Sequence, residues 1–288
     1  QIEKEVVLKK FVHAMLILSA IFCFSCQGTS PRKEGGIVVL SPEVAEIVCA
    51  LGAENQIAAV TEECNYPPGL AAKQKVGNFS AINREAIIAL KPALVFCSSL
   101  EQEMIAAELG KLGLKVEVVY PGSLEGLFSA IGRIGSLIDR QTEASKLIGT
   151  MKKDIELIRQ SSKGKPRPKV YLEIYRNPLM SVADSSFVGV LIETAGGDNI
   201  FSSLERDYAR VNSEAVIKAR PDVMICYSQD SLEGILARKG WQNIPALTNR
   251  DILFEKDLNP DLLQRATPRS VLGMKQLRLI FDRWQARQ

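Results

Sequence analysis

The chain has 288 residues, of which 46% are hydrophobic, and its formal net charge is +3. This length and composition are typical of a globular protein with substantial cores and room for two domains of ordinary size. A net charge this small, without a run of basic residues, argues against a nucleic-acid-binding protein.

The first predicted element is an export signal. Lys9 and Lys10 precede an apolar stretch of fourteen residues, Phe11–Phe24, which is short for a membrane span. Ser25 followed by Cys26 resembles the cleavage box of bacterial lipoproteins. We expect a signal peptide over 1–26, lipidation at Cys26, and an exported protein in the periplasm or on the outer face of the cytoplasmic membrane. Cleavage nearby without lipidation and an uncleaved anchor are the alternatives.

The only histidine, His13, lies inside this signal, so the exported chain is expected to contain none. This excludes serine or cysteine catalysis with a histidine base, and histidine-ligated zinc or haem iron. The remaining part has no Cys-x-x-Cys spacing and no phosphate-binding loop pattern, so we expect no enzyme. Buried free thiols are the expected state of its cysteines, and pairing of Cys97 with Cys226 is the alternative.

After a tether over 27–36, strands and helices alternate along the chain. Such alternation predicts parallel sheets covered by helices. A helix of about twenty residues near the middle would span about 30 Å, enough to reach from one domain to another. The expected elements in chain order are strand Ile37–Leu40, a helix from Pro42 to Leu51, strand Ile57–Val60, a turn at Tyr66–Gly69, helix Glu101–Leu112, strand Val116–Val119, helix Leu124–Ile138, a helix capped by Thr142 that runs to Gln160, strand Val170–Tyr175 and helix Arg269–Trp284.

One sequence unit occurs twice. Ile82–Cys97 and Val211–Cys226 are identical at six of sixteen positions, at an offset of 129 residues. Each copy is predicted to be a helix that ends before Lys-Pro or Arg-Pro, followed by a buried strand. The offset is too long for a solenoid repeat. We therefore predict two similar lobes, over 37–123 and 166–288, joined by connecting helices over 124–161 and separated by a cleft.

From Ile37 to Trp284 the chain resembles the substrate-binding proteins of ABC importers with a rigid helical backbone, which carry cobalamin, ferric siderophores and haem. The markers are Ser41-Pro42 after the first strand, Tyr66-Pro67-Pro68, the two repeated units, and Gly196–Phe201. The resemblance implies an α/β fold of two Rossmann-like lobes with parallel sheets, joined by one long interdomain helix. It also implies a protein without catalytic activity or a cofactor or metal of its own.

Within this family the likeness is closest to the cobalamin-binding members. Asp261 and Arg265 match the loop from which an Asp and an Arg reach the ligand, and Tyr66, Phe79 and Tyr208 match aromatic residues around the corrin ring. Aromatic faces suit a broad conjugated ligand, and an arginine suits a polar edge. Phe79 and Tyr208 occupy matched positions, so we expect them to face each other across the cleft. A core position for Phe79, and a surface ion pair of Arg265 with Asp261, are the alternatives.

Glu63 and Ser98 stand where the cobalamin-binding proteins have further aromatic residues. A less aromatic cleft suits a different corrinoid or an iron chelate with more polar edges. The expected function is therefore capture of a corrinoid and its delivery to a membrane permease, without a metal ligand from the protein. A ferric siderophore or other iron chelate is the alternative ligand, and a sensor or scaffold lipoprotein without transport is the remote alternative.

Glu85 and Glu214 lie at matched positions in the first turn of the two repeated helices. A carboxylate is favoured there by the helix dipole, which by itself explains both residues. The resemblance implies a further role, in which each lobe uses its glutamate to dock onto one subunit of the permease dimer that works with ATPase subunits. The binding protein itself is expected to be a monomer.

Overall fold

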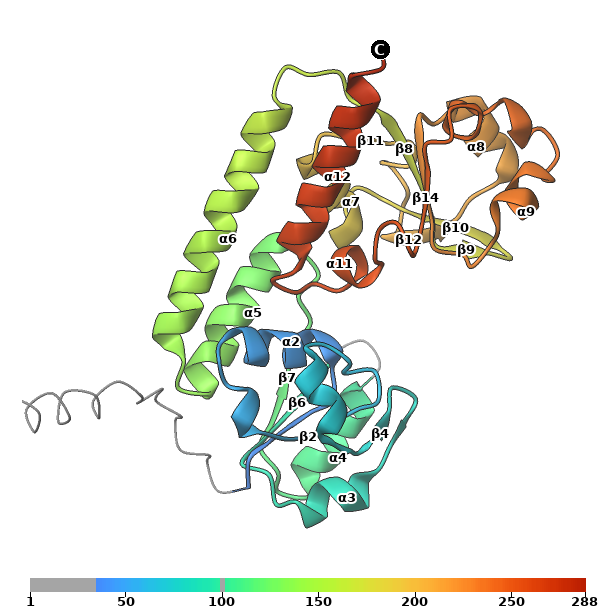
Figure 1. Cartoon of the computed structure of the whole chain (residues 1–288). Helices are drawn as coiled ribbons and strands as arrows, with labels where there is room; N and C mark the ends of the chain where they lie inside the picture. The colour runs from blue at the N-terminus through green and yellow to red at the C-terminus, as the bar shows by residue number, and fades with distance from the viewer. Residues whose placement is uncertain (1–34, 99–101) are drawn as a thin grey trace, which may run out of the picture. The chain divides into compact units, whose positions relative to one another are not determined.

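The computed structural model of the chain describes residues 35–98 and 102–288 (Figure 1). The export signal, Cys26 and most of the tether lie outside the described residues, and so does the start predicted for helix Glu101–Leu112. Within the described ranges, no helix combines the length and the apolar character needed to cross a membrane.

The N-terminal lobe is built on a five-stranded parallel sheet with the strand order β3-β2-β1-β6-β7. Alternate residues of β1 belong to different apolar clusters: Val39 to the largest one and Val38 to a second. Both faces of the sheet are therefore covered, as expected for parallel strands. The elements of this lobe are β1 Ile37–Val39, α2 Pro42–Ala50, β2 Ile57–Val60, β3 Gln74–Lys75, β4 Gly77–Asn78, β5 Ala81–Ile82, α3 Arg84–Ala89, β6 Leu94–Cys97, α4 Glu103–Lys111, β7 Val116–Val118 and the 3₁₀ turns Glu54–Gln56 and Pro68–Ala72.

The C-terminal lobe contains a four-stranded parallel sheet with the order β11-β8-β13-β14. A second sheet, β12-β10-β9, is antiparallel and was not predicted from the sequence. The strand predicted over Val170–Tyr175 ends at Glu173, and Tyr175 begins β9 of this second sheet. The elements are β8 Lys169–Glu173, β9 Tyr175–Arg176, β10 Leu179–Val182, α7 Phe187–Thr194, β11 Asp198–Asn199, β12 Tyr208–Arg210, α8 Ser213–Ala219, β13 Val223–Cys226, α9 Leu232–Leu236, the 3₁₀ turn Trp241–Asn243, α10 Pro245–Thr248, β14 Ile252–Phe254, α11 Asp261–Gln264 and α12 Ser270–Gln285.

The repeated sequence unit forms the predicted helix and strand in both lobes. It gives α3 and β6 in the first copy, and α8 and β13 in the second (Figure 1). Both strands are fully buried and occupy an interior position in their sheets. Cys97 and Cys226, at the ends of these strands, are free and buried, as is Cys64, so the expected buried free thiols are confirmed for these three, whereas Cys49 is free but only half-buried.

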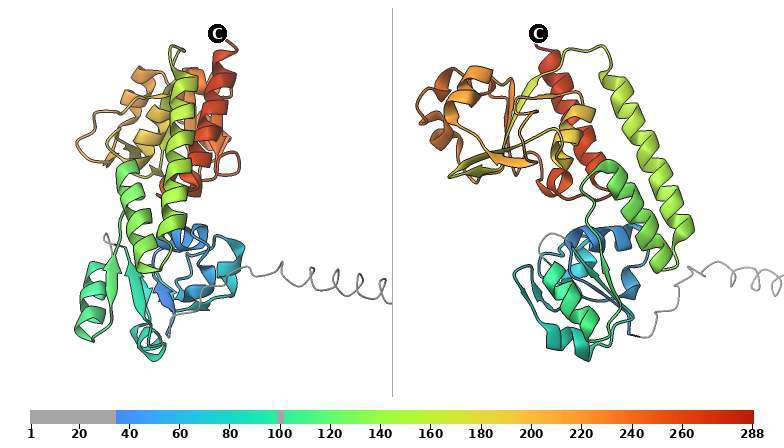
Figure 2. Two further views of the ribbon diagram at one scale, coloured as in Figure 1. Left: turned by 90° about the vertical axis from the view of Figure 1, so that its left-hand side faces the viewer. Right: turned by 180° about the vertical axis from the view of Figure 1, so that it is seen from behind.

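Two helices connect the lobes, α5 over Leu124–Leu137 and α6 over Gln141–Ser162. Helix α6 packs against both α5 and α12, and Figure 2 shows α5 beside the lower part of α6 and α12 beside its upper part. The cap predicted at Thr142 is wrong, because α6 begins at Gln141, and Arg140, two residues before Thr142, holds the cap position without a side-chain capping hydrogen bond. The reason is the tight connection from α5, in which the Arg140 N–H donates to the Gly135 carbonyl and Asp139 has a positive φ of 58°.

The largest apolar cluster runs through both lobes and the connecting helices. It contains Ile47 of α2, Ile131 of α5, Ile155 of α6, Leu191 of α7 and Met274 of α12, all buried. The described residues, 35–98 and 102–288, accordingly belong to one compact unit. The prediction of an α/β fold with two parallel sheets is confirmed.

Candidate functional site

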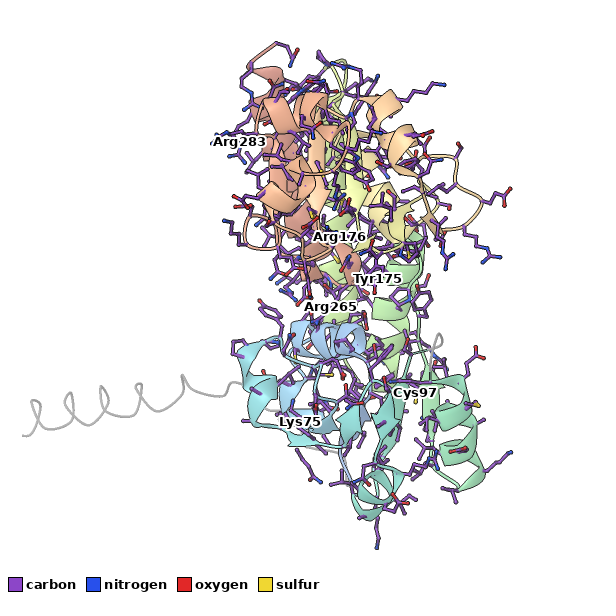
Figure 3. All side chains as sticks on the ribbon, turned by 90° about the vertical axis from the view of Figure 1, so that its right-hand side faces the viewer. Lys75, Cys97, Tyr175, Arg176, Arg265 and Arg283 are labelled. Atoms are coloured by element: carbon purple, nitrogen blue, oxygen red, sulfur yellow. The ribbon has the colours of Figure 1, made fainter. Side chains whose placement is uncertain are left out.

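Ligands of parallel α/β sheets bind beyond the carboxyl ends of the strands. The predicted ligand-binding residues come from several segments near those ends and from the segment before α12. Tyr66 follows β2, Phe79 lies in the turn between β4 and β5, and Tyr208 begins β12. Asp261 begins α11 and Arg265 directly follows it. Figure 3 shows Arg265 at the level where the two lobes meet.

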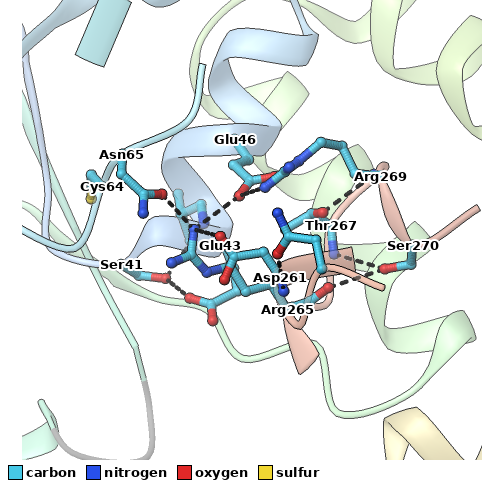
Figure 4. Close-up of polar contacts among 12 residues, drawn as sticks. Ser41, Glu43, Glu46, Cys64, Asn65, Asp261, Arg265, Thr267, Arg269 and Ser270 are labelled. Atoms are coloured by element: carbon cyan, nitrogen blue, oxygen red, sulfur yellow. Dashed lines mark hydrogen bonds and ion pairs between the residues drawn. The ribbon is translucent and has the colours of Figure 1, made fainter. Parts of the chain in front are cut away.

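A cluster of charged side chains surrounds Glu46, the fifth residue of α2 (Figure 4). The Arg269 guanidinium donates from Nε to Oε2 of Glu46 at 2.7 Å and from Nη2 to Oε1 at 2.6 Å. Such two-point pairing is the strongest form of an arginine–carboxylate contact. Glu46 is only 4% exposed, and these donors satisfy the hydrogen-bonding capacity of its buried carboxylate. We call Glu46, Asn65, Asp261, Arg265 and Arg269 the Glu46 cluster.

Arg265 belongs to this cluster through a single nitrogen. Its Nη1 lies 2.8 Å from Oδ1 of Asn65, 3.2 Å from Oδ2 of Asp261 and 3.3 Å from Oε1 of Glu46. The ion pair with Asp261 considered as an alternative is therefore present, but Arg265 also reaches two residues of the N-terminal lobe. Because these contacts all use Nη1, they leave the other edge of the guanidinium plane unengaged within the described residues.

Tyr66 lies on the face of the Arg269 guanidinium, whose central carbon is 3.6 Å from the ring centroid. Burial alone would lower the pKa of Arg269, but the hydrogen bonds and charge of Glu46 outweigh it and raise that pKa. A hollow of about 280 Å³ lies beside this stack. It is lined by Glu46, Cys49, Ala50, Tyr66, Pro67, Pro268 and Arg269.

Phe79 is half-buried, and it belongs to none of the core clusters of the described residues. Its backbone N–H donates to Oε1 of Glu63 at 2.9 Å. Burial would raise the pKa of Glu63, but this bond and others, with the charge of Arg265, lower it overall. Glu63 is thus a carboxylate within electrostatic range of Arg265. Ser98, the other polar replacement, is buried and its N–H donates to Gln102 Oε1 at 2.9 Å.

Tyr208 of the C-terminal lobe is 40% exposed, and burial of its hydroxyl, with Tyr120 and Asp207 nearby, raises its pKa to about 12. Tyr120, which follows β7 and is 49% exposed, has a pKa raised by burial, by Asp207 and by Glu43. Tyr120 is therefore a residue of the N-terminal lobe within electrostatic range of Tyr208. Sequence reasoning missed it, although Tyr120-Pro121-Gly122 directly follows a predicted strand. The described rings of Phe79 and Tyr208 make no stacking contact, so their pairing stays a prediction.

A second buried charge network lies in the C-terminal lobe and was also missed. Glu173, at the carboxyl end of β8, is fully buried and accepts two hydrogen bonds from Arg238, at 2.6 and 2.7 Å. Arg238 also donates to Asp230 at 2.7 Å, and Arg176 of β9 donates to the same carboxylate at 3.0 Å. The network therefore fixes the β9 strand against the segment that follows β13.

Glu85 and Glu214 each occupy the second position of their helix and are exposed. Within the described part of the chain, neither carboxylate forms an ion pair. Both side chains are therefore free to meet a partner, and their docking role stays a prediction.

No group of three His, Cys, Asp or Glu residues in the described ranges could hold a metal ion. Burial raises the pKa of Cys49 and of Cys97 to about 12, so these thiols stay protonated at neutral pH. The site thus offers aromatic faces, phenol hydroxyls and paired charges, which are groups that bind a ligand without reacting with it.

The chain is similar to curated proteins over most of its length. It is 28% identical over 264 residues to the vitamin B12-binding protein of Vibrio vulnificus, covering 90% of this chain and 93% of that protein. It is 27% identical to the uncharacterized ABC transporter substrate-binding lipoprotein YvrC of Bacillus subtilis, covering 86% and 79%.

Solved structures match the same fold. The periplasmic vitamin B12-binding protein BtuF of Vibrio cholerae superposes with a TM-score of 0.74 at 24% identity, covering 87% of this chain and 98% of that one. A possible iron-binding periplasmic solute-binding protein from Staphylococcus epidermidis gives a TM-score of 0.76 at 26% identity, covering 86% and 99%.

The profile of a family described as periplasmic binding protein matches residues 37–257. This match covers both parallel sheets and, of the Glu46 cluster, Glu46 and Asn65, and it confirms the resemblance noted in the sequence. The chain therefore belongs to the periplasmic binding protein family, and it is a binding protein and not an enzyme.

Proposed function

We propose that this protein is the extracytoplasmic substrate-binding lipoprotein of an ABC importer. It captures a corrinoid between its lobes and delivers it to the membrane permease. The observation that carries the proposal is the similarity to a vitamin B12-binding protein over 90% of the chain.

The chemistry of the candidate site supports a corrinoid. Such a ligand has a broad conjugated ring with amide groups along its edge, so it needs apolar faces and hydrogen-bonding groups together. Tyr66, Phe79 and Tyr208 are partly exposed aromatic residues, and Tyr120 adds a fourth. Arg265 offers the unengaged edge of its guanidinium to an amide oxygen, while Asp261 holds its other edge.

Delivery is assigned to Glu85 and Glu214. Two exposed carboxylates at equivalent positions of two similar lobes suit a partner with twofold symmetry, such as a permease dimer with its ATPase subunits. Complementary charge would guide the loaded protein, acting as a monomer, onto basic residues of both permease subunits.

Membrane attachment follows from the export signal. A signal peptide over 1–26 and lipidation at Cys26 would leave 27–36 as a tether before β1. The similarity to a Bacillus subtilis protein described as a lipoprotein supports this assignment. The lobes would then correspond to 37–123 and 166–288, with the connecting helices over 124–161.

A ferric siderophore or other iron chelate is the second candidate ligand. The similarity to a possible iron-binding protein from Staphylococcus epidermidis favours it, as do the polar residues Glu63 and Ser98. A chelate with polar edges would use Glu63 as an acceptor for its N–H or O–H groups.

Native mass spectrometry tests both candidates in one experiment. The purified protein is incubated separately with cyanocobalamin, cobinamide, ferrichrome and haemin, and the mass of the complex is recorded. A one-to-one complex with cyanocobalamin or cobinamide is expected. Binding of ferrichrome alone would replace the corrinoid with the second candidate, and binding of haemin alone would overturn both.

A further inference from the structure

The Glu46 cluster joins the two lobes by charge. Glu46 belongs to α2 of the N-terminal lobe, whereas Arg265 and Arg269 lie 219 and 223 residues further along, on either side of the turn into α12. Among the ion pairs of the described residues, only these two connect a residue before α5 to a residue after α6. Figure 4 shows the two arginines converging on the one carboxylate.

Because Glu46 is buried, separating it from Arg265 and Arg269 should require considerable free energy. The neighbouring α2 residues Ala45 and Ile47 are fully buried in the apolar cluster that runs through both lobes. A carboxylate in such a place is tolerated only while its donors stay in hydrogen-bonding range. If the lobes moved apart at this point, Glu46 and both arginines would lose their shared hydrogen bonds together.

The arginine side of the contact is equally constrained. The Arg269 guanidinium is hydrogen-bonded along one edge by Glu46, and the ring of Tyr66 lies on its face. Arg265 is held through Nη1 by Glu46, Asn65 and Asp261, which come from both lobes. Glu46 thus contacts both arginines, Arg269 at two points and Arg265 at one.

The geometry points to Glu46 and Arg269 as an interlobe clasp that fixes the spacing of the lobes, with Glu46 as the positioning residue for Arg265. Both sides of the clasp are side chains of this protein. It limits the opening of the cleft in addition to the stiffness of α6.

Distance measurements between the lobes test the clasp. Spin labels carried by noncanonical amino acids at the exposed positions Ser80 and Ser203 avoid the native thiols. Pulsed electron resonance on the free protein then records the distance distribution. We expect Glu46→Gln and Arg269→Gln each to broaden it about twofold and shift it to longer distances. Glu43→Gln is the matched control, because Glu43 lies on the same helix and accepts from Ser41.

Arg269→Lys provides a milder variant, which keeps the charge but not the two-point fork. It should give a distance distribution of intermediate width. It also replaces the glutamine variants in the test if those do not fold. Unchanged distributions in the Glu46 and Arg269 variants, or an equal change in Glu43→Gln, would overturn the clasp.

Positioning of Arg265 is tested with cyanocobalamin by calorimetry. Arg265→Ala should weaken binding in the parent and weaken it less in the Glu46→Gln background, since Arg265 is less firmly held once the Glu46 carboxylate is replaced. Full additivity would refute the positioning role. If the parent binds no cyanocobalamin, the proposed ligand is wrong while the distance result still decides the clasp.

Discussion

Asn83 and Asn212 perform the same task in the two lobes, each accepting a hydrogen bond from the backbone N–H three residues further on. The distances are 2.9 Å to the Ala86 nitrogen and 2.7 Å to the Ala215 nitrogen. These caps fix the first turns of α3 and α8, and they place Glu85 and Glu214 at equivalent helix positions. The duplicated sequence therefore yields duplicated carboxylates on the surface.

Reversal of both charges should separate ligand binding from delivery. We expect the Glu85→Arg/Glu214→Arg protein to bind cyanocobalamin like the parent but to support no uptake in vesicles containing the permease, because like charges would then meet. Each single reversal should be intermediate. The double variant Glu103→Arg/Glu233→Arg is the control, since it changes the same charge in exposed first-turn positions of α4 and α9. Uptake at the parental rate in the first variant would contradict the docking role.

Truncation of the cleft aromatics should weaken binding of the ligand. Phe79→Ala, Tyr120→Ala and Tyr208→Ala are each expected to cost about 1–3 kcal/mol of binding free energy through lost burial and stacking. Calorimetry with cyanocobalamin measures this directly. Leu157→Ala, which removes an exposed apolar side chain on α6, should leave the affinity unchanged. Parental affinity in all three aromatic variants would place the ligand elsewhere.

Removal of Arg269 should destabilise the fold far more than removal of an exposed arginine. Arg269→Ala leaves the Glu46 carboxylate buried beside Arg265 alone, and we expect a loss of about 3–5 kcal/mol. Arg84→Ala breaks the pair with Glu108, in which both side chains are about half exposed, and should cost about 0–1 kcal/mol. Urea unfolding of the two variants gives the comparison. Equal losses of unfolding free energy in the two variants would show that burial does not make the Glu46–Arg269 pair more important for stability than the exposed pair.

The carboxylate of Asp230 should make stability depend on acid pH. Burial would raise the pKa of Asp230, but hydrogen bonds from Arg238 and from the Ser231 backbone, with the nearby arginine charges, lower it overall. A carboxylate whose pKa is lower in the folded than in the unfolded chain stabilises the fold when the pH is above the unfolded pKa, which is about 3.9 for an aspartate. This contribution to stability is lost as the pH falls through the pKa of the folded state.

Asp230→Asn should therefore be less stable than the parent at neutral pH, and the difference should shrink as the pH falls below about 4. Urea unfolding at several pH values measures it. The exposed Asp198, which lies outside this network, is the site of the control variant Asp198→Asn. A difference that stays constant down to the lowest pH would contradict the role of the charge.

The main helices and strands of the fold could be predicted from local sequence patterns. Strand Ile57–Val60 has the predicted bounds, and α5 differs from its prediction by one residue, because apolar runs and caps specify such elements within a few residues. The sheet β12-β10-β9 could not be predicted from the sequence. Its strands are two to four residues long, and they pair across segments as distant as Met180 and Arg210.

The candidate site could be predicted only in part, because its contacts also join residues that lie far apart in the sequence. The similarity of Asp261 and Arg265 to family positions drew attention to them, but their partner Glu46 carries no local signal except a charge within an apolar helix. Its role depends on residues more than 200 positions away in the chain. Tyr120 likewise becomes a candidate only when the fold brings it near Asp207 and Tyr208.

The continuous apolar cluster has a consequence for how the protein unfolds. Because Ile47, Ile155 and Met274 belong to one core, neither half of the duplicated architecture can expose its side of that core without destabilising the other. Heating should melt residues 37–288 in one cooperative transition instead of lobe by lobe. The two lobes thus form a single thermodynamic domain, and an isolated lobe would not be expected to fold.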